Sequence, residues 1–541
     1  PLYQKFDRTE CDEFPAYLNS PEPSFFEGHG AFDFIVVGAG SAGCVVANRL
    51  SENTKWTVLL VEAGPNPPAE SIMPSMSASL YNTQYSWNFS TVNDGGAQSD
   101  VDETYPWQRG RMLGGSSSIN GMVYIRGNTR DFQKWYDEGN TEWHPDIVDK
   151  YFKKAENLQD WKIRNSPLGK IYGQNGPLII NSFNASDSEN YTRLLGSYKE
   201  IDIPTAIDLN NQLIGAGKYR VTANLGTRQS TAKAYLNPVR KRKNLKVLKN
   251  SLVVKIMIHE RTKTAYGVKV LRDGREITYY AKKEVILSAG ALNTPQILML
   301  SGIGPKKHLS SLKLNSIADL PVGQNLQDHP VVPVPIFVDD DSIKYLTAPE
   351  KVSCSDAFKI NDEMIDSIVE NNKKHSLFIF AFLLLNPKSR GEITLKSTDP
   401  KETPIVAGDF FDDPNDIADA IEGIKILTKI VNTKYFKSAK GFLGRLKFDA
   451  CNDLKLDSKE YWGCIVKAMG RVIFHPVGTA KMGKDSKNAV VDGKLKVHGV
   501  KNLRVIDASV MPSITSGNTN APTIMIAERA CDLIKNDYVR I

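Results

Sequence analysis

The feature that most constrains this chain is a glycine-rich loop between two apolar segments near its start. Residues 34–37 are β-branched or aromatic without interruption, which is typical of a buried parallel strand. The loop 38–43 follows, then a segment of helical character, 44–50, and a second apolar strand, 57–61. Together they have the length of one βαβ unit, about 30 residues. The sequence therefore predicts a Rossmann-type dinucleotide-binding domain.

The residue types in this loop match what a dinucleotide requires. Gly38 permits the tight turn out of the strand, Gly40 removes a Cβ where the pyrophosphate approaches, and Gly43 lets helix and strand pack closely. The helix N-terminus offers free N–H groups and a positive dipole end to the phosphates. Glu62 lies 19 residues after Gly43, where its carboxylate can accept hydrogen bonds from ribose hydroxyls.

Only one such fingerprint is found. The stretch 215–217 lacks the third glycine, and 302–305 has a proline where a helix would have to begin. Enzymes that pass hydride between NAD and a bound flavin usually have two fingerprints. The single site must therefore bind either NAD(P) or a resident flavin.

Composition excludes several classes of protein. The chain has 541 residues, 41% of them hydrophobic and 24% charged, so two to four ordinary globular domains are expected. The net charge of +7 is a mild bias, and the short basic cluster 240–243 is better explained as a solvated turn than as a nucleic-acid site. The longest apolar run, 377–385, is far shorter than the ~20 residues of a membrane-spanning helix. No metal site is predicted.

Six further stretches decide the cofactor by resemblance. They are residues 109–121, 290–304, 322–329, 474–479, 505–509 and 517–523. Together they closely resemble the glucose–methanol–choline (GMC) oxidoreductase family, over nearly the whole chain from about residue 32 to residue 535. The C-terminal stretch, and Tyr461-Trp462 with its flanking cysteines, are most similar to the arthropod members.

The resemblance implies an α/β fold in which a Rossmann-type FAD-binding domain is interleaved with a sheet-based, α+β substrate-binding domain. Residues 31–330 would form the N-terminal part, mostly FAD-binding. Residues 331–541 would hold the substrate-binding region and a catalytic C-terminus that returns to the FAD domain.

FAD is the implied cofactor, and the family's positions assign residues to it. The expected set is Gly38, Gly40, Ser41, Ala42, Gly43, Glu62 and Ala63 for the ADP half; Val253 for adenine; Arg111, Gly114, Gly115, Ser116, Asn120, Gly121 and Met122 for pyrophosphate and flavin; Asp507 and Ala508 for the ribityl-phosphate side; and Asn518, Asn520, Ala521 and Thr523 near the isoalloxazine. Some relatives attach FAD through a histidine where this chain has Ile119, so non-covalent FAD is predicted. The small, donor-rich loop 114–118 also suits an anion.

The same resemblance identifies a catalytic pair. Oxidising an alcohol requires a base of near-neutral pKa for the hydroxyl proton, and histidine suits this role. His475 stands in the family's active-site motif, while Asn518 takes the place of a second histidine found in many relatives. Asparagine cannot take up a proton, so it would orient the hydroxyl. For His329 a structural role is favoured.

Residues for substrate recognition are less constrained. Phe378, Phe380 and Phe382 alternate with period two, so one strand face presents three aromatic rings, and Phe474 adds a ring beside the base. Ordinary core packing explains the three strand residues equally well. The pattern favours a small apolar or aromatic alcohol over a sugar, with cyanohydrins such as mandelonitrile included.

The expected activity is therefore FAD-dependent alcohol oxidation, with hydride passing to flavin N5 and electrons to O2, giving H2O2. Two alternatives stay open. One is a dehydrogenase that uses a quinone acceptor, on a sugar or another alcohol. The other is a non-redox hydroxynitrile lyase, because the same fold hosts one in plants. The oligomeric state is not predicted.

Cysteines and sequons point weakly to secretion. Six cysteines allow fifteen full pairings, and Cys451–Cys464 is predicted because only twelve residues separate the two. Cys44 is expected to be a buried free thiol. Glycosylation sequons begin at Asn88, Asn184 and Asn190. The chain starts at Pro1 without a methionine, so a lost leader and an extracellular location are expected.

Overall fold

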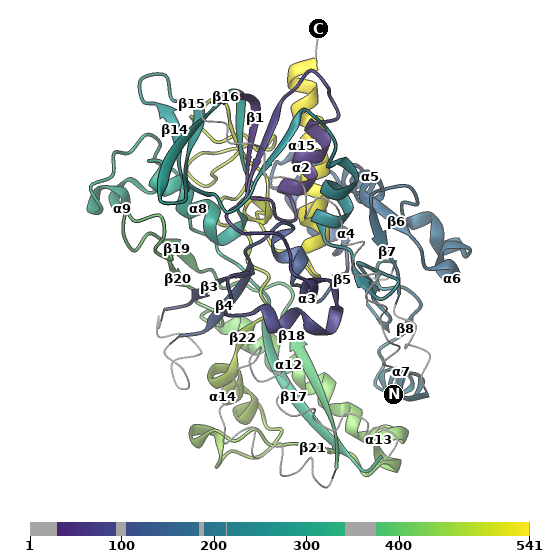
Figure 1. Cartoon of the computed structure of the whole chain (residues 1–541). Coiled ribbons are helices and arrows are strands. Elements are labelled where there is room, and N and C mark those ends of the chain that lie inside the picture. Colours follow the sequence, from purple (N-terminus) through teal and green to yellow (C-terminus); the bar gives the residue numbers. More distant parts are fainter. Residues whose placement is uncertain (1–29, 93–103, 183–188, 212–213, 341–374, 540–541) are drawn as a thin grey trace.

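The larger of two main sheets builds the nucleotide-binding half of the computed structural model, which describes residues 30–92, 104–182, 189–211, 214–340 and 375–539 (Figure 1). It has seven strands in the order β13-β2-β1-β16-β15-β14, with β23 paired to β16. Their bounds are β1 Ala31–Val37, β2 Val58–Val61, β13 Leu245–Leu248, β14 Leu252–His259, β15 Thr264–Arg272, β16 Arg275–Leu287 and β23 Leu503–Val505.

The βαβ unit predicted from the sequence is present at the centre of this sheet. β1 pairs in parallel with β2 on one side and with β16 on the other, and Phe34 and Val58 are fully buried. Helix α2, Gly43–Leu50, connects the two strands and buries nearly all of its residues. Strands buried on both faces explain why their sequences are continuous apolar runs rather than alternating ones.

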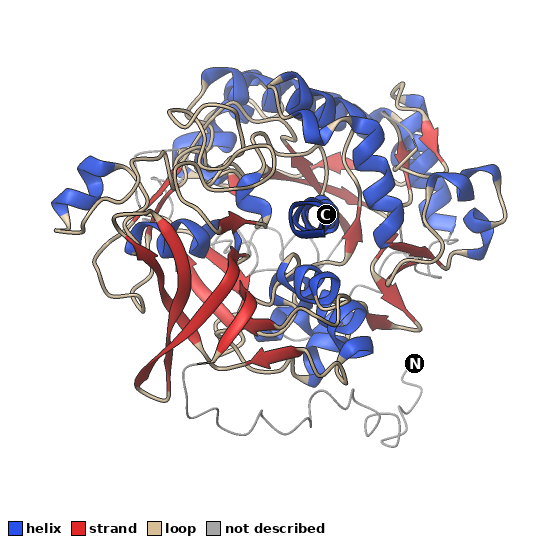
Figure 2. Ribbon diagram, turned by 90° about the horizontal axis from the view of Figure 1, so that it is seen from above, coloured by secondary structure: helices blue, strands red, loops and turns tan. Residues whose placement is uncertain are grey.

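The C-terminal segment returns to this sheet. β23 adds in parallel to the end of β16, and the chain then enters α15, Asn520–Val539. Figure 2 looks almost along α15, which lies in the middle of the molecule. It packs against α2 and against α5, Pro145–Ala155. Residues about 480 positions apart in sequence are thereby held together, as in the bond from Ser41 Oγ to Asn520 Oδ1 (2.7 Å).

A second sheet lies at the other end of the molecule (Figure 1). Its order is β18-β17-β21, with β22 also paired to β17. Helices α12 and α14 pack on it. The bounds are β17 Pro330–Val338, β18 Ser376–Leu383, β21 Phe442–Leu443, β22 Arg471–Val472, α12 Pro414–Thr428, α13 Lys434–Ser438 and α14 Lys459–Met469. The predicted α/β fold, in which a Rossmann-type part is interleaved with a second, sheet-based part, is confirmed.

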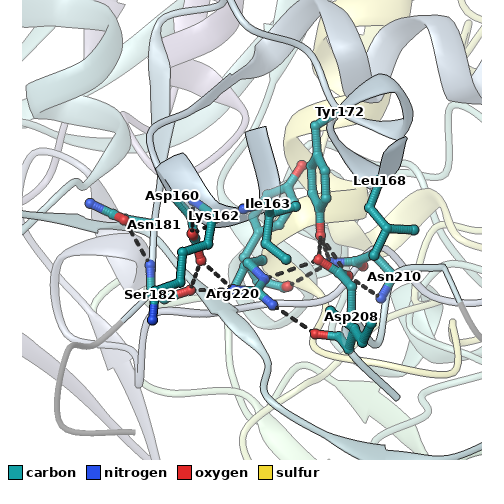
Figure 3. Close-up of polar contacts among 12 residues, drawn as sticks. Asp160, Lys162, Ile163, Leu168, Tyr172, Asn181, Ser182, Asp208, Asn210 and Arg220 are labelled. Atoms are coloured by element: carbon teal, nitrogen blue, oxygen red, sulfur yellow. Dashed lines mark hydrogen bonds and ion pairs between the residues drawn. The ribbon is translucent and has the colours of Figure 1, made fainter. Parts of the chain in front are cut away.

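A buried ionic cluster stabilises the flank of the molecule beside α6, Trp161–Arg164 (Figure 3). The Arg220 guanidinium contacts Asp160 Oδ2 at 2.6 Å and Asp208 Oδ2 at 3.1 Å, and Tyr172 Oη donates to Asp208 Oδ1 at 2.8 Å. Two carboxylates on one buried guanidinium compensate its desolvation. Arg220 starts β10, Arg220–Val221, which pairs with β5, Val123–Tyr124, so the cluster supports the chain directly after Met122.

Smaller expectations are met unevenly. The Cys451–Cys464 disulfide is present, and Cys44 is a buried free thiol. Asn88 is exposed on β3, Ser86–Ser90, whereas Asn184 and the side chain of Asn190 lie outside the described residues. Within the described ranges, every helix is too short or too polar to cross a membrane.

Candidate active site

A cavity of about 370 Å³ opens where the loops after β1 and β2 meet the C-terminal segment. Its walls come from segments far apart in the sequence. From the expected cofactor set, the structure places in these walls Gly38, Gly40, Ser41, Ala42, Glu62, Ala63, Gly115, Ser116, Asn120, Gly121, Met122, Val253, Asp507, Ala508, Asn518, Asn520 and Thr523.

Two glycine loops approach each other closely at this cavity. A Cβ on Gly115 would lie 2.7 Å from the Cα of Gly40, and Gly115 also has a left-handed backbone with φ +51°. A Cβ on Gly43 would lie 1.8 Å from the carbonyl oxygen of Gly38. Glycine at these positions therefore brings backbone N–H groups to the cavity wall without an intervening side chain.

Two carboxylates fix the loops around the cavity. Glu62 accepts hydrogen bonds from the backbone N–H groups of Ala39 (2.8 Å) and Gly64 (2.9 Å), one on each carboxylate oxygen. Each oxygen keeps a further lone pair, which a ribose hydroxyl can use. Asp507 accepts from the N–H of Gly290 (2.9 Å) and the hydroxyl of Thr294 (2.6 Å). Burial raises the pKa of both carboxyl groups.

Four residues of the expected cofactor set lie behind the wall instead of in it. Gly43 packs α2 on the turn at Gly38, and the N–H of Gly114 donates to the carbonyl of Ala39 (2.7 Å). The guanidinium of Arg111 stacks on Trp87, 5.1 Å from the ring centroid. Ala521 is buried in the first turn of α15. These residues shape the cavity through the backbone.

The residues present fit FAD. The residues at the N-termini of α2 and α15 line the cavity, and helix N-termini offer free N–H groups and a positive dipole end that suit an anion such as pyrophosphate. The Ser288 hydroxyl is buried at the wall with no hydrogen-bond partner among the described residues, so a bound polar group would satisfy it. Val253 and Leu252 supply an apolar surface on which the adenine ring of FAD can lie.

The catalytic pair predicted from the sequence also lines the cavity. His475 Nε2 is 3.1 Å from the amide nitrogen of Asn518, and both residues line the cavity. Burial, followed by the neighbouring His329 and Arg109, holds the pKa of His475 well below 6.5. The imidazole is therefore neutral at neutral pH and can accept a proton.

Aromatic rings enclose this end. The ring of Phe474 packs edge-on to Tyr81 at 6.4 Å and stacks on Tyr105 at 6.0 Å. Phe474 has a left-handed backbone with φ +63°, unusual for a bulky residue, and its carbonyl accepts a bond from Arg109 Nη1 (2.7 Å). Tyr81 and Trp87 also line the cavity, and nothing in the sequence pattern singled them out.

The structure does not place Phe378, Phe380 and Phe382 at the cavity, which agrees with the core-packing alternative for these residues. Phe378 packs against Phe436 of α13 at 5.6 Å, and Phe382 lies against Gly423 of α12. All three belong to the hydrophobic core between the second sheet and its helices, and none is in the cavity wall. A period of two identifies one strand face but does not say which neighbour covers it.

Arg109 is a charged residue at the site that the sequence reasoning did not assign. Its guanidinium is enclosed by protein at the cavity wall, and burial lowers its pKa to about 10, although Asp328 opposes this. Among the described residues, its guanidinium donates one hydrogen bond, to the backbone carbonyl of Phe474. A permanent positive charge thus lies beside His475 in a low-dielectric environment.

His329 also lies at the site rather than in remote packing. Its Nδ1 is 2.9 Å from Nδ1 of His475, and its Nε2 is 3.0 Å from the carbonyl oxygen of Thr515. The motif position of His329, directly before β17, gave no indication that the chain would bring it to His475, 146 residues away.

The chain is similar to known proteins over nearly its whole length. The family model described as GMC oxidoreductase matches residues 32–331 in its N-terminal part and 387–527 in its C-terminal part. The chain is 36% identical to an ecdysone oxidase of Spodoptera littoralis, over 99% of this chain and 96% of that protein. It is 35% identical to a glucose dehydrogenase [FAD, quinone] of Drosophila pseudoobscura pseudoobscura, over 99% and 92%.

Solved structures extend the similarity to three dimensions. A formate oxidase of Aspergillus oryzae RIB40, studied for the effect of a mutation on FAD modification, superimposes with a TM-score of 0.81 at 30% identity. The match covers 94% of this chain and 99% of that one.

Proposed function

The chain is a member of the GMC oxidoreductase family, an FAD enzyme acting on alcohol-type substrates, and we propose that it oxidises a small apolar or aromatic alcohol to the carbonyl compound. The observation that carries this proposal is the pairing of a neutral, half-buried His475 with Asn518 beside aromatic rings at the cavity. Cyanohydrins such as mandelonitrile fall within the same substrate class.

His475 and Asn518 have different roles toward the hydroxyl group of the alcohol. His475 Nε2 accepts the hydroxyl proton of the alcohol, and the Asn518 amide donates a hydrogen bond to the same oxygen, which holds the alcohol in place. FAD, when bound in the cavity, supplies the acceptor for the hydride that leaves the carbon.

The substrate class is argued from the cavity wall. Tyr81, Trp87 and Phe474 present aromatic rings in the cavity that His475 also lines, and apolar surface favours a ring or hydrocarbon chain over a polyhydroxylated sugar. The relatives named above include both an ecdysone oxidase and a glucose dehydrogenase, so sugars belong in any test panel.

For the electrons we propose O2 as the acceptor, with H2O2 as the product; a quinone is the alternative. Anaerobic mixing with a panel of apolar, aromatic and sugar alcohols should bleach the flavin fastest with the apolar and aromatic ones. Admitting air should then restore the oxidised spectrum within seconds. Reoxidation over many minutes, with rapid recovery on adding a quinone, would show a dehydrogenase. A flavin that never bleaches while a cyanohydrin is cleaved would show a lyase.

We propose further that FAD is bound non-covalently. Ile119 lies in the cavity wall, where an apolar side chain cannot form a bond to the flavin. Acid precipitation should leave yellow flavin in the supernatant. Flavin retained in the pellet would contradict this.

Finally, we propose that the protein works in an oxidising, extracellular compartment. The Cys451–Cys464 disulfide and the exposed sequon at Asn88 support this. Removing N-glycans from protein secreted by insect cells should increase its electrophoretic mobility, and an Asn88→Gln variant should lose part of that shift. If the secreted protein carries no N-glycan, Asn88 is not glycosylated, and the exposed sequon no longer supports an extracellular location.

A further inference from the structure

We propose that His329 is a positioning residue that fixes the tautomer of His475, so that Nε2 of His475 presents a lone pair to the substrate hydroxyl. The inference deepens the proposed function, because it rests on His475 being the base. It goes beyond the catalytic pair, since His329 lies behind His475 on the side away from the cavity wall.

The first line of argument begins at the carbonyl of Thr515. A carbonyl oxygen can only accept, so the nitrogen 3.0 Å from it, His329 Nε2, must carry a hydrogen. A neutral imidazole has one N–H, so His329 Nδ1 then has a lone pair. The atom facing that lone pair at 2.9 Å is Nδ1 of His475, which must donate. With Nδ1 protonated, a neutral His475 has its lone pair at Nε2.

The second line begins at Asn518 and reaches the same result independently. Its amide nitrogen is a donor, and it lies 3.1 Å from His475 Nε2. A protonated Nε2 would place two donors against each other at that distance. The contacts on the two ring nitrogens of His475 thus favour the same tautomer. An alcohol at the site would take the lone pair of Nε2 in place of the Asn518 amide, so that the bond to His329 is the contact that holds the tautomer during the reaction.

His329 can hold this role only if it stays neutral. It is fully buried, and burial lowers its pKa to about 4. The charged and titratable groups nearby are Arg109, Asp328 and His475 itself. Asp328 is directed to the backbone, since its Oδ1 accepts the N–H of His329 at 2.7 Å, and the charge of Arg109 lowers the pKa of the neighbouring His475. No carboxylate among the described residues bonds to the His329 ring.

The same bond has a second use once His475 has taken up the proton. The imidazolium would then donate from Nδ1 to a neutral acceptor, a charge-assisted hydrogen bond that is stronger than the neutral one. The contacts to His329 and to His475 Nε2 come from the same loop, because Thr515 and Asn518 are three residues apart. A shift of this loop would disturb the base and the orienting amide together.

Matched variants separate positioning from packing. In His329→Gln the amide oxygen can accept from His475 Nδ1 while the amide nitrogen donates to Thr515, so the polarity of the chain of bonds is kept. His329→Leu removes both bonds. His498→Leu is the control, because His498 Nε2 also bonds to a backbone carbonyl, that of Gly483 at 2.9 Å, and lies outside the cavity wall.

Two readouts are needed. The tautomer of His475 is read from the 15N chemical shifts of histidine-labelled holoenzyme, assigned by the signal lost in His475→Ala. The rate of anaerobic flavin reduction by the best alcohol gives the kinetic effect. In wild-type protein Nδ1 of His475 should be protonated. His329→Leu should lose the fixed tautomer and reduce flavin about 10²–10⁴-fold more slowly, the usual weight of general base catalysis. His329→Gln should recover to within about tenfold, and His498→Leu should match wild type.

Several results would overturn the inference. A wild-type His475 protonated at Nε2 would do so alone, even if His329→Leu failed to fold. Wild-type rates in a folded His329→Leu, or equal losses in the Leu and Gln variants, would assign His329 to packing. Failure of the proposed function is distinguishable, since His475→Ala would then reduce flavin at the wild-type rate.

Discussion

Replacing Gly115 with alanine tests the cofactor cradle with a magnitude that the structure sets. Its Cβ would lie 2.7 Å from the Cα of Gly40, whereas non-bonded carbons meet at about 3.5–4.0 Å. The two loops must therefore separate by about 1 Å. That separation displaces the backbone N–H groups at the cavity wall that would hold the pyrophosphate of FAD, and one lost bond to a charged group costs about 1.5–3 kcal/mol. We expect FAD to bind about ten- to a hundredfold more weakly.

Gly499 provides a matched control. It also has a left-handed backbone, φ +70°, but an added Cβ would meet no atom within 4 Å. Alanine at either position therefore pays the same left-handed penalty of about 1–2 kcal/mol, and only the Gly115 variant adds the clash. Any difference between the two in FAD affinity comes from the contact with Gly40.

The measurement is a titration of each apoprotein with FAD, followed by the quenching of flavin fluorescence. Urea unfolding of both apoproteins, followed by circular dichroism, checks that they fold equally well. Equal FAD dissociation constants in Gly115→Ala and Gly499→Ala would refute the argument that the two glycine loops must touch for FAD to bind.

Three further outcomes are expected. His475→Ala should keep the flavin spectrum and reduce flavin about 10²–10⁴-fold more slowly than wild type. In Asn518→Ala the reduction rate should fall only about two- to tenfold, which is the contribution of one hydrogen bond. If stopped-flow traces show the larger loss in Asn518→Ala, the two roles are misassigned. The wild-type reduction rate should rise with pH through an inflection below 6.5, because burial and then His329 and Arg109 lower the pKa of His475; removing the positive charge in Arg109→Gln should move that inflection upward, and an unmoved profile would contradict the electrostatic reading. Replacing both Cys451 and Cys464 by serine should lower the free energy of unfolding by about 3 kcal/mol for a loop of this size, measured in urea, and no change would show that the bond does not restrain the unfolded chain.

What the sequence predicted well depends on local physics. The turn at Gly38 and the close packing at Gly43 are required by contacts within a few residues of the chain, and the loop bears this out. Glu62 could be placed because it ends the strand that must neighbour the first one. Helix and strand bounds in this unit agree to within a few residues for the same reason.

The aromatic residues of the cavity wall could not be predicted from local patterns in this way. Alternation in β18 correctly indicates one shared face, but the partner of that face is set by where α12 and α13 pack, tens of residues later in the chain. Conversely, Tyr81 and Trp87 lie in segments without strong periodicity, so no pattern marks them as cavity residues. Their position becomes apparent only when the second sheet and the C-terminal segment are placed against the nucleotide-binding half.

The same limit applies most sharply to His475, whose chemistry depends on three segments meeting. A histidine in a recognisable motif predicts a base, but its tautomer, and hence which nitrogen can act, is decided by what bonds to the other nitrogen. Here that is His329, at the start of the second sheet, which is itself oriented by the carbonyl of Thr515 on the loop that carries Asn518. Each hydrogen bond in this series depends on the orientation of the previous residue, so no single sequence position predicts the arrangement. Substitution of Thr515, His329 or Asn518 should therefore change the orientation or tautomer of His475.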